Sequence, residues 1–284
     1  MGKGLLDPKV DFVFKNIFGS PNHPEILISF LNATLKAKKK IVNVDIKKTD
    51  IEKQYIEDKY SRLDVKATTS NDEIINIEIQ LKNENNMVKR SLYYLSKMYE
   101  EQLNEKEDYS KLVRTVCINI LNFKYLKTDN FHTGYRFKEI ESNEELTDIM
   151  EVHFIEIPKL QDSSDEKDML VAWTEFLKDP ESEKVRGLEL SIEEIRQAKD
   201  ELIRMSNDST QRELYDMRAN SLRDKMSELN AAERKGIEKG REEGREEGRK
   251  EEKIKIARNM KLNGLDTNTI AKVTNLSEDE IDKL

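Results

Sequence analysis

The chain has 284 residues, of which 36% are apolar and 37% are charged, and its formal net charge at pH 7 is −8. No segment approaches the roughly 18 consecutive apolar residues of a membrane span, and the first ten residues lack the apolar core of a signal peptide. We therefore expect a cytoplasmic protein without a membrane partner. The single cysteine, Cys117, excludes a disulfide framework and a thiolate metal site within one chain, and its apolar neighbours predict a buried thiol.

The charge is distributed unevenly along the chain. Residues 1–127 carry 22 Lys and Arg against 18 Asp and Glu, a net charge of +4, whereas the remainder carries 27 against 39, a net charge of −12. A partner with phosphate groups is therefore expected to contact the first half.

Helical and strand-like segments alternate in the first half of the chain. Apolar residues at helical spacing predict one helix over Val10 to Phe18 and a second over Glu25 to Leu35, and a longer helix is predicted over Asn85 to Leu103. The predicted strands are Ile41 to Ile46, Arg62 to Thr68, Ile74 to Leu81, Arg114 to Phe123 and Glu151 to Ile157. This order indicates an α/β fold with a mixed central sheet flanked by helices.

The second half is expected to form a C-terminal helical extension. Its first predicted helices begin near Asp165, Ser191 and Thr210. Ser163 and Ser164 are candidate caps for the first of these helices, and Ser191 with Glu194 has the pattern of a capping box for the second.

Residues 233–252 contain a glycine at every fourth position. These glycines are Gly236, Gly240, Gly244 and Gly248. Pairs such as Glu242 with Arg245 support a helix, while each glycine costs about 1 kcal/mol relative to alanine. The pattern predicts a marginal helical linker, and the alternative is a glycine stripe that brings two helices together in a dimer.

Residues 254–284 predict three short helices, the last opened by Ser277 with Glu280. Their spacing resembles a helix-turn-helix, but the segment has no dense basic face. We favour docking or homo-oligomerisation through these C-terminal helices, with DNA reading as the alternative. The expected organisation is a core over 1–160, a helical subdomain over 161–232, a linker over 233–253 and a tail over 254–284.

The segments around residues 65 and 77 predict a β-hairpin. In Ile74 to Leu81 the apolar and polar residues alternate strictly, which indicates a strand with one buried face. A turn centred on Asn71 would place Asp64 opposite Glu78, and Lys66 opposite Asn76.

Two facing carboxylates repel each other, because side chains of paired residues begin about 5 Å apart. A divalent cation would compensate this repulsion, and two carboxylates suit Mg²⁺, which keeps several waters and accepts phosphate oxygens. Such a cation can activate water and neutralise charge on a phosphodiester. The alternative is that Asp64 and Glu78 lie on the solvated face of an ordinary hairpin, with the register displaced by two residues.

The string Arg62-Leu63-Asp64-Val65, followed by Glu78-Ile79-Gln80, resembles the PD-(D/E)XK nuclease superfamily. Three further features narrow the resemblance: the string Asp11-Phe12-Val13-Phe14-Lys15, the helix with Arg90 and Tyr94, and the string Phe154-Ile155-Glu156-Ile157-Pro158-Lys159. Over about residues 5–180 the chain is similar to the recombination-promoting nuclease family of transposase-like proteins. This resemblance implies a restriction-endonuclease-like core and DNA cleavage linked to recombination or mobile elements.

The resemblance also implies roles for individual residues. Asp64 and Glu78 would bind the metal, Gln80 stands where the superfamily usually has lysine, and Asp11 would be a helix-borne acid. Because Gln80 brings no positive charge, a nearby lysine has to supply it. The candidates are Lys15, Lys66 and Lys82.

Arg90 and Tyr94 share one stripe of the helix after the hairpin, where they suit contact with the substrate phosphate. The alternative is a partly solvated helix edge whose tyrosines cap the core. The expected function is a Mg²⁺-dependent endodeoxyribonuclease, with Mn²⁺ as a second usable metal and DNA as the partner. The competing functions are a catalytically silent nucleic-acid-binding or assembly module and a hydrolase that acts on RNA.

Overall fold

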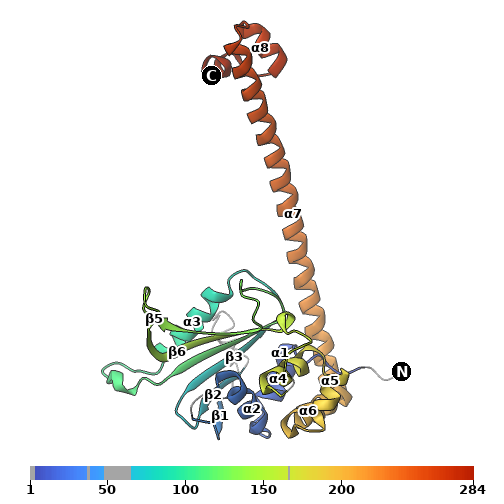
Figure 1. Ribbon diagram of the computed structural model, residues 1–284. Coiled ribbons are helices and arrows are strands. Elements are labelled where there is room, and N and C mark those ends of the chain that lie inside the picture. Colours follow the sequence, from blue (N-terminus) through green and yellow to red (C-terminus); the bar gives the residue numbers. More distant parts are fainter. Residues whose placement is uncertain (1–3, 37–38, 48–64, 166) are drawn as a thin grey trace. The chain divides into compact units, whose positions relative to one another are not determined.

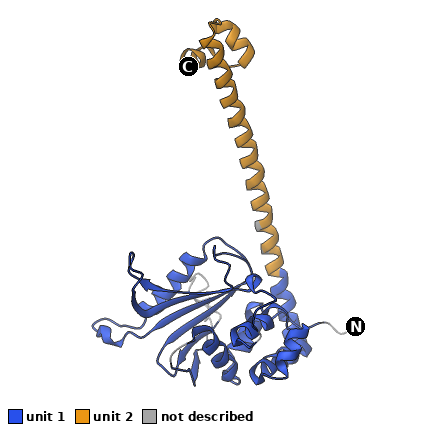
Figure 2. Cartoon of the chain, in the orientation of Figure 1, with its two compact units in different colours: residues 1–220 blue, residues 221–284 orange. Residues whose placement is uncertain are grey.

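The computed structural model describes residues 4–36, 39–47, 65–165 and 167–284, and the chain divides into two compact units. Unit 1 covers residues 1–220 and unit 2 covers residues 221–284 (Figure 2). Unit 1 contains the sheet together with the helices of the segment 161–207, so these helices and the sheet form one compact body.

Unit 1 is built on a six-stranded sheet with the order β1-β2-β3-β4-β6-β5 (Figure 1). Its strands are β1 Val44–Lys47, β2 Val65–Thr69, β3 Ile74–Gln80, β4 Thr115–Leu121, β5 His132–Lys138 and β6 Glu145–Glu156. Strands β1, β2 and β3 are antiparallel neighbours, β3, β4 and β6 are parallel, and β5 is antiparallel to β6. The predicted mixed sheet is confirmed.

Helices cover both faces of this sheet. Helix α3 (Met87–Glu100) lies on one face, where Met87 and Leu95 pack against Cys117 and Phe154. The other layer contains α1 (Asp11–Phe18), α2 (Pro24–Leu35) and α4 (Met169–Lys178) (Figure 1). Its centre is an aromatic cluster formed by Phe18, Phe30 and Trp173.

Strand β3 is buried on both faces. Ile75 and Ile77 are buried on one face and Asn76 and Glu78 on the other. The predicted half-solvated strand is therefore wrong, because α3 covers the polar face and β3 lies inside the sheet between β2 and β4.

Three details of the helices and strands differ from expectation. Helix α4 is capped by Asp168, whose side chain accepts from the Leu170 backbone N–H, rather than by Ser163 or Ser164. Helix α6 (Glu193–Asn207) has no side-chain cap, and the Ser191 hydroxyl donates instead to the Leu188 carbonyl, so the predicted capping box is wrong. The sequence does not predict helix α5 (Glu183–Glu189) or strand β5, and within the described residues short 3-10 turns cover 109–111 and 157–159.

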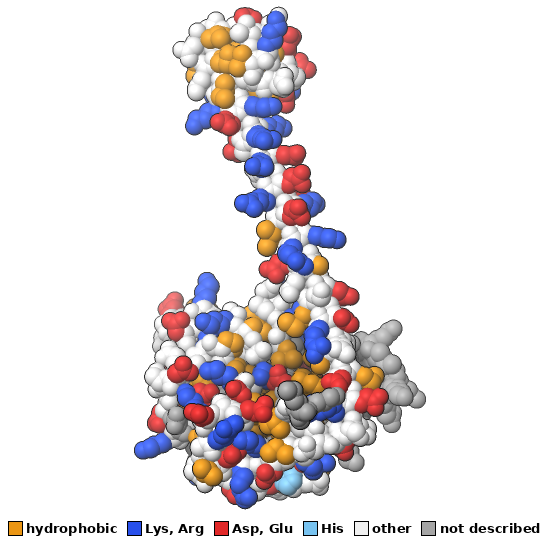
Figure 3. Space-filling view, turned by 90° about the vertical axis from the view of Figure 1, so that its right-hand side faces the viewer, with side chains coloured by type: hydrophobic (Ala, Val, Ile, Leu, Met, Phe, Trp, Pro, Cys, Tyr) orange, Lys and Arg blue, Asp and Glu red, His pale blue; other side chains and the backbone are white. Residues whose placement is uncertain are grey.

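Helix α7 (Ser209–Leu262) passes from unit 1 into unit 2 and includes the whole glycine repeat. Basic and acidic side chains lie side by side along it (Figure 3). It is followed by α8 (Thr267–Thr274) and α9 (Glu278–Asp282), which pack on its end through a small core. The predicted capping box of Ser277 with Glu280 is confirmed at α9. In the part of the chain that the structure describes, no helix is both long and apolar enough to span a membrane.

Candidate active site

The hairpin of β2 and β3 has the predicted register. Lys66 pairs with Asn76, and Val65 pairs with Ile77. Asp64, the predicted partner of Glu78, lies outside the described residues. On its other side β3 runs parallel to β4, which places Glu78 beside Asn119.

Glu78 is fully buried beneath α3. Its Oε2 atom lies 3.3 Å from Nε of Arg90, and the Arg90 guanidinium stands over the Tyr94 ring at 5.3 Å from the ring centroid. Its Oε1 atom is buried and has no hydrogen-bond partner among the described residues, and the same holds for Oδ1 of Asn76 on the same strand face. The site therefore contains two buried oxygen acceptors whose hydrogen-bonding capacity is unused.

Burial raises the pKa of Glu78 to about 7, although the charge of Arg90 and hydrogen bonds from Arg90 and Asn76 act against this rise. A buried carboxylate loses its hydration, and the contacts with Arg90 and Asn76 compensate only part of that loss. The interpretation of Glu78 as an acid on a solvated hairpin face is therefore wrong. Its burial favours the neutral form of the carboxyl over the charged form.

The two predicted lysines near the hairpin have different surroundings: Lys66 forms an ion pair, and Lys82 lies just beyond the end of β3. Nζ of Lys66 lies 3.7 Å from Oε2 of Glu101, just after α3. Gln80 is the half-buried last residue of β3, and Lys82 follows it at intermediate exposure. Gln80 and Lys82 thus lie where the hairpin strand leaves the sheet.

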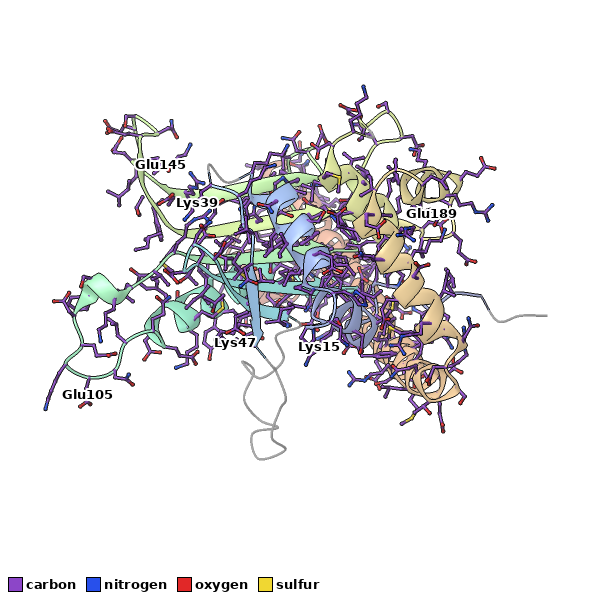
Figure 4. The ribbon with its side chains drawn as sticks, turned by 90° about the horizontal axis from the view of Figure 1, so that it is seen from below. Lys15, Lys39, Lys47, Glu105, Glu145 and Glu189 are labelled. Carbon is purple, nitrogen blue, oxygen red and sulfur yellow. The ribbon has the colours of Figure 1, made fainter. Side chains whose placement is uncertain are left out.

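Asp11 and Lys15 lie on α1 rather than on the hairpin. Oδ2 of Asp11 accepts from Nη1 of Arg218 at 2.6 Å, and its Oδ1 accepts from the Phe12 backbone N–H. Lys15 lies one helical turn further along α1, on the lower side of unit 1 in Figure 4. Among the described residues no three His, Cys, Asp or Glu side chains form a cluster that could hold a metal ion.

A second buried polar cluster lies on the opposite sheet face, and the sequence did not predict it. Glu151 Oε1 lies 2.5 Å from Nε2 of His153, and Nδ1 of His153 lies 2.9 Å from Nε2 of His132. Glu151 Oε2 accepts from Nη2 of Arg114 at 2.6 Å and from Nε of Arg136 at 2.8 Å. The two histidines meet only because β5 pairs with β6, and the sequence does not predict strand β5.

A pocket of about 580 Å³ opens beside this cluster. Arg114 and Arg136 line it together with Lys39 and Glu145, which lie at the same end of the sheet (Figure 4). Both arginines are paired with carboxylates, since Arg136 also donates to Glu145 and Arg114 to Glu73. Their charges are therefore largely satisfied within the protein.

Two models of known protein families match the chain. The model of the PD-(D/E)XK nuclease family transposases matches residues 8–232. The chain belongs to this family. A second model, that of the C-terminal helix-turn-helix domain of the Rpn/YhgA-like nuclease family, matches residues 250–284. No curated protein and no solved structure matches the chain.

Membership in the PD-(D/E)XK nuclease family confirms the resemblance and the restriction-endonuclease-like core. The protein is a nuclease of a family linked to mobile elements or recombination. Its helix-turn-helix tail implies DNA as a partner, which supports the alternative of DNA reading over docking alone.

Proposed function

We propose that this PD-(D/E)XK protein is a divalent-metal-dependent endonuclease that hydrolyses phosphodiester bonds of DNA. Mg²⁺ is the proposed working metal and Mn²⁺ a substitute. The observation that carries the proposal is the buried Glu78 carboxylate with one unpartnered oxygen beside the unpartnered Asn76 oxygen. Oxygen acceptors of this kind fit a hard cation, which in a nuclease also binds the substrate phosphate.

Asp64 and Glu78 are the proposed metal ligands. The register of the described hairpin supports this assignment, because the paired positions agree with those that set Asp64 opposite Glu78 in the sequence interpretation. A bound divalent cation supplies activation of water and neutralisation of charge at the phosphate. Gln80, at the end of β3, is proposed to orient a water or phosphate oxygen by hydrogen bonding.

The remaining proposed residues supply charge and position. Lys66 and Lys82 flank the hairpin, and Lys15 and Asp11 lie on α1. Each lysine is a candidate for the positive charge that Gln80 lacks. Replacing Lys15, Lys66 and Lys82 one at a time with glutamine identifies the required charge as the variant with the largest loss in cleavage rate.

A plasmid-cleavage assay with and without a chelator tests the proposal. We expect nicking or linearisation in Mg²⁺ or Mn²⁺, loss of cleavage by orders of magnitude in Asp64→Asn, and unchanged cleavage in Glu105→Gln. Glu105 is the matched control because it is an exposed carboxylate in the connection between α3 and β4 (Figure 4). Absence of cleavage across metal and salt titrations contradicts the proposal, and preference for an RNA duplex contradicts its DNA assignment.

The second candidate is a catalytically silent nucleic-acid-binding or assembly module, which the helix-turn-helix tail favours. A metal titration separates the two functions, because only a protein with a working site gains thermal stability by mass action from millimolar Mg²⁺. The melting temperature of Asp64→Asn should not respond to Mg²⁺. A response equal to that of the wild type removes Asp64 from the site.

The tail is proposed to serve DNA engagement and homo-oligomerisation rather than chemistry. The nuclease match ends at residue 232, and every proposed active-site residue precedes it. Deleting residues 233–284 should leave the Mg²⁺ response in place while weakening DNA binding and changing the mass measured by light scattering. Loss of the Mg²⁺ response in a folded truncated protein contradicts this separation.

A further inference from the structure

Arg90 is positioned to act on the proposed metal site from α3. It lies in the first turn of the helix, and its side chain reaches the Glu78 carboxylate through one long contact of 3.3 Å. Arginine binds carboxylates most strongly through two short parallel hydrogen bonds. Among the described residues Arg90 makes only the single contact with Glu78, so this ion pair is weak for its buried position.

The same guanidinium also contacts an aromatic ring. It stands over the face of Tyr94, where a cation is attracted by the ring. The Arg90 side chain is 23% exposed, and the next turn carries the exposed Tyr93. Because its side chain already reaches the surface of α3, Arg90 can move from Glu78 toward the solvent.

A divalent cation and Arg90 compete for one carboxylate. A guanidinium within hydrogen-bond distance of Glu78 would lie within a few ångströms of a cation on the same carboxylate, and repulsion between the two positive charges is strong where water is excluded. Cation binding therefore favours departure of Arg90. A released guanidinium at the mouth of the site meets the charge that a nucleic acid brings, namely phosphate.

Resting on the proposed function, we propose that Arg90 is an exchangeable counterion: it neutralises Glu78 when no metal is bound and transfers to a DNA phosphate when the metal binds. Metal and DNA then bind with positive coupling, because each favours the released position of Arg90. Thermodynamic linkage requires this coupling to be equal in both directions.

The test compares metal affinity and DNA affinity in the full-length protein. Mn²⁺ and Mg²⁺ binding are measured by calorimetry without DNA at alkaline pH, where a proton does not compete for the carboxylate. Arg90→Gln should bind metal several-fold more tightly than the wild type and bind DNA more weakly in the presence of metal. The gain in affinity for DNA caused by metal should shrink in the same variant.

Lys89→Gln is the matched control. Lys89 precedes Arg90 on α3 and carries the same charge, but its side chain is exposed. This variant should retain the metal affinity of the wild type. Tighter metal binding in Lys89→Gln, equal to that in Arg90→Gln, would show that overall charge rather than the Glu78 contact governs binding, and would overturn the proposal.

Unchanged or weaker metal binding in a folded Arg90→Gln overturns the exchange directly. Should that variant fail to fold, Arg90→Met decides, because a thioether of similar length can still pack against the Tyr94 ring but removes the positive charge, and it should bind metal more tightly. If the wild type cleaves DNA but its metal affinity equals that of the Arg90 variants, only this inference is overturned. Tighter metal binding in the variants without any DNA cleavage by the wild type overturns only the proposed reaction.

Discussion

Glu78 and Glu151 are buried glutamates on opposite faces of one sheet, and their surroundings differ sharply. Glu78 on β3 has a long contact to Arg90, a hydrogen bond from Asn76 and one oxygen without a partner. Glu151 on β6 receives hydrogen bonds on both oxygens from Arg114, Arg136 and His153. Burial is similar in the two cases, so the difference lies in how completely the protein itself satisfies each carboxylate.

The two pKa values express this difference. Burial raises the pKa of both carboxyls, but at Glu151 the hydrogen bonds from His153, Arg114 and Arg136 outweigh burial and hold its pKa at about 2. At Glu78 burial dominates, and the pKa is about 7. A fully satisfied carboxylate stabilises the fold, whereas a partly satisfied one reserves coordination for a ligand at a cost in stability.

Replacing either glutamate with neutral glutamine should therefore affect activity and stability in opposite ways. This contrast between the two variants is the largest effect that we expect. Glu78→Gln should reduce DNA cleavage by orders of magnitude while leaving the free energy of unfolding unchanged or higher at neutral pH. Glu151→Gln should lower the free energy of unfolding by about 3 kcal/mol, because the buried charged acceptor of Arg114, Arg136 and His153 is removed. Chemical denaturation beside plasmid cleavage measures both quantities.

The comparison also requires that Glu151→Gln retain the Mg²⁺-induced rise in melting temperature. A folded Glu151→Gln protein that no longer responds to Mg²⁺ would place the second cluster in the metal site. A destabilised Glu78→Gln would show that the Arg90 contact stabilises the fold more than burial of the carboxylate destabilises it.

The dependence of stability on pH should have opposite signs at the two residues. The folded-state pKa of Glu78 is raised from 4.5 to about 7. Its contribution to the free energy of unfolding is therefore complete below pH 4.5 and is lost as the pH rises through about 7. The loss is at most about 3 kcal/mol at 1.36 kcal/mol per pKa unit. The folded-state pKa of Glu151 is lowered to about 2, so its contribution is present above pH 4.5 and is lost as the pH falls through about 2.

The difference between the unfolding free energies of wild type and Glu78→Gln, measured across pH, isolates the contribution of Glu78. Subtraction is needed because burial lowers the pKa of His132 from 6.5 to about 4, which gives an opposing slope in an overlapping window. The advantage of Glu78→Gln over the wild type should grow between pH 4.5 and 7. A difference that stays constant over that range contradicts the raised pKa.

The sequence predicted the Glu78 side of this comparison far better than the Glu151 side. Alternation in Ile74 to Leu81 and the polar turn determine the hairpin register, because a slip of one residue would exchange the two faces. Nothing local predicts that α3 covers the polar face. Burial of Glu78 and its contact with Arg90 depend on packing between segments, which periodicity does not encode.

The Glu151 cluster depends on an edge strand whose alternating apolar pattern is short and weak. Strand β5 has the sequence His-Thr-Gly-Tyr-Arg-Phe-Lys, in which only Tyr135 and Phe137 are apolar residues at alternating positions, and a glycine interrupts the run. Without β5, His132 and His153 are distant in sequence and have no reason to meet. Arg136 likewise reaches Glu151 only through the pairing of β5 with β6.

The smallest expected effect concerns how tightly the second cluster is packed. Gly134 on β5 pairs with His153, and a Cβ atom added at Gly134 would lie 3.0 Å from Cε1 of the His153 ring. That ring is held between Glu151 and His132, so it cannot move without lengthening a buried hydrogen bond. Gly134→Ala should therefore lower the free energy of unfolding by about 1–2 kcal/mol, the usual cost of overpacking.

Gly187→Ala is the matched control for this substitution. Gly187 lies in α5, and an added Cβ atom there meets no atom within 4 Å among the described residues. Alanine in a helix interior is favoured by about 1 kcal/mol, so this variant should be more stable than the wild type. Both variants should keep wild-type cleavage and Mg²⁺ response, since neither touches Glu78. If Gly134→Ala is as stable as Gly187→Ala, the His153 ring has room to shift, and the Glu151 cluster is more adaptable than its hydrogen bonds imply.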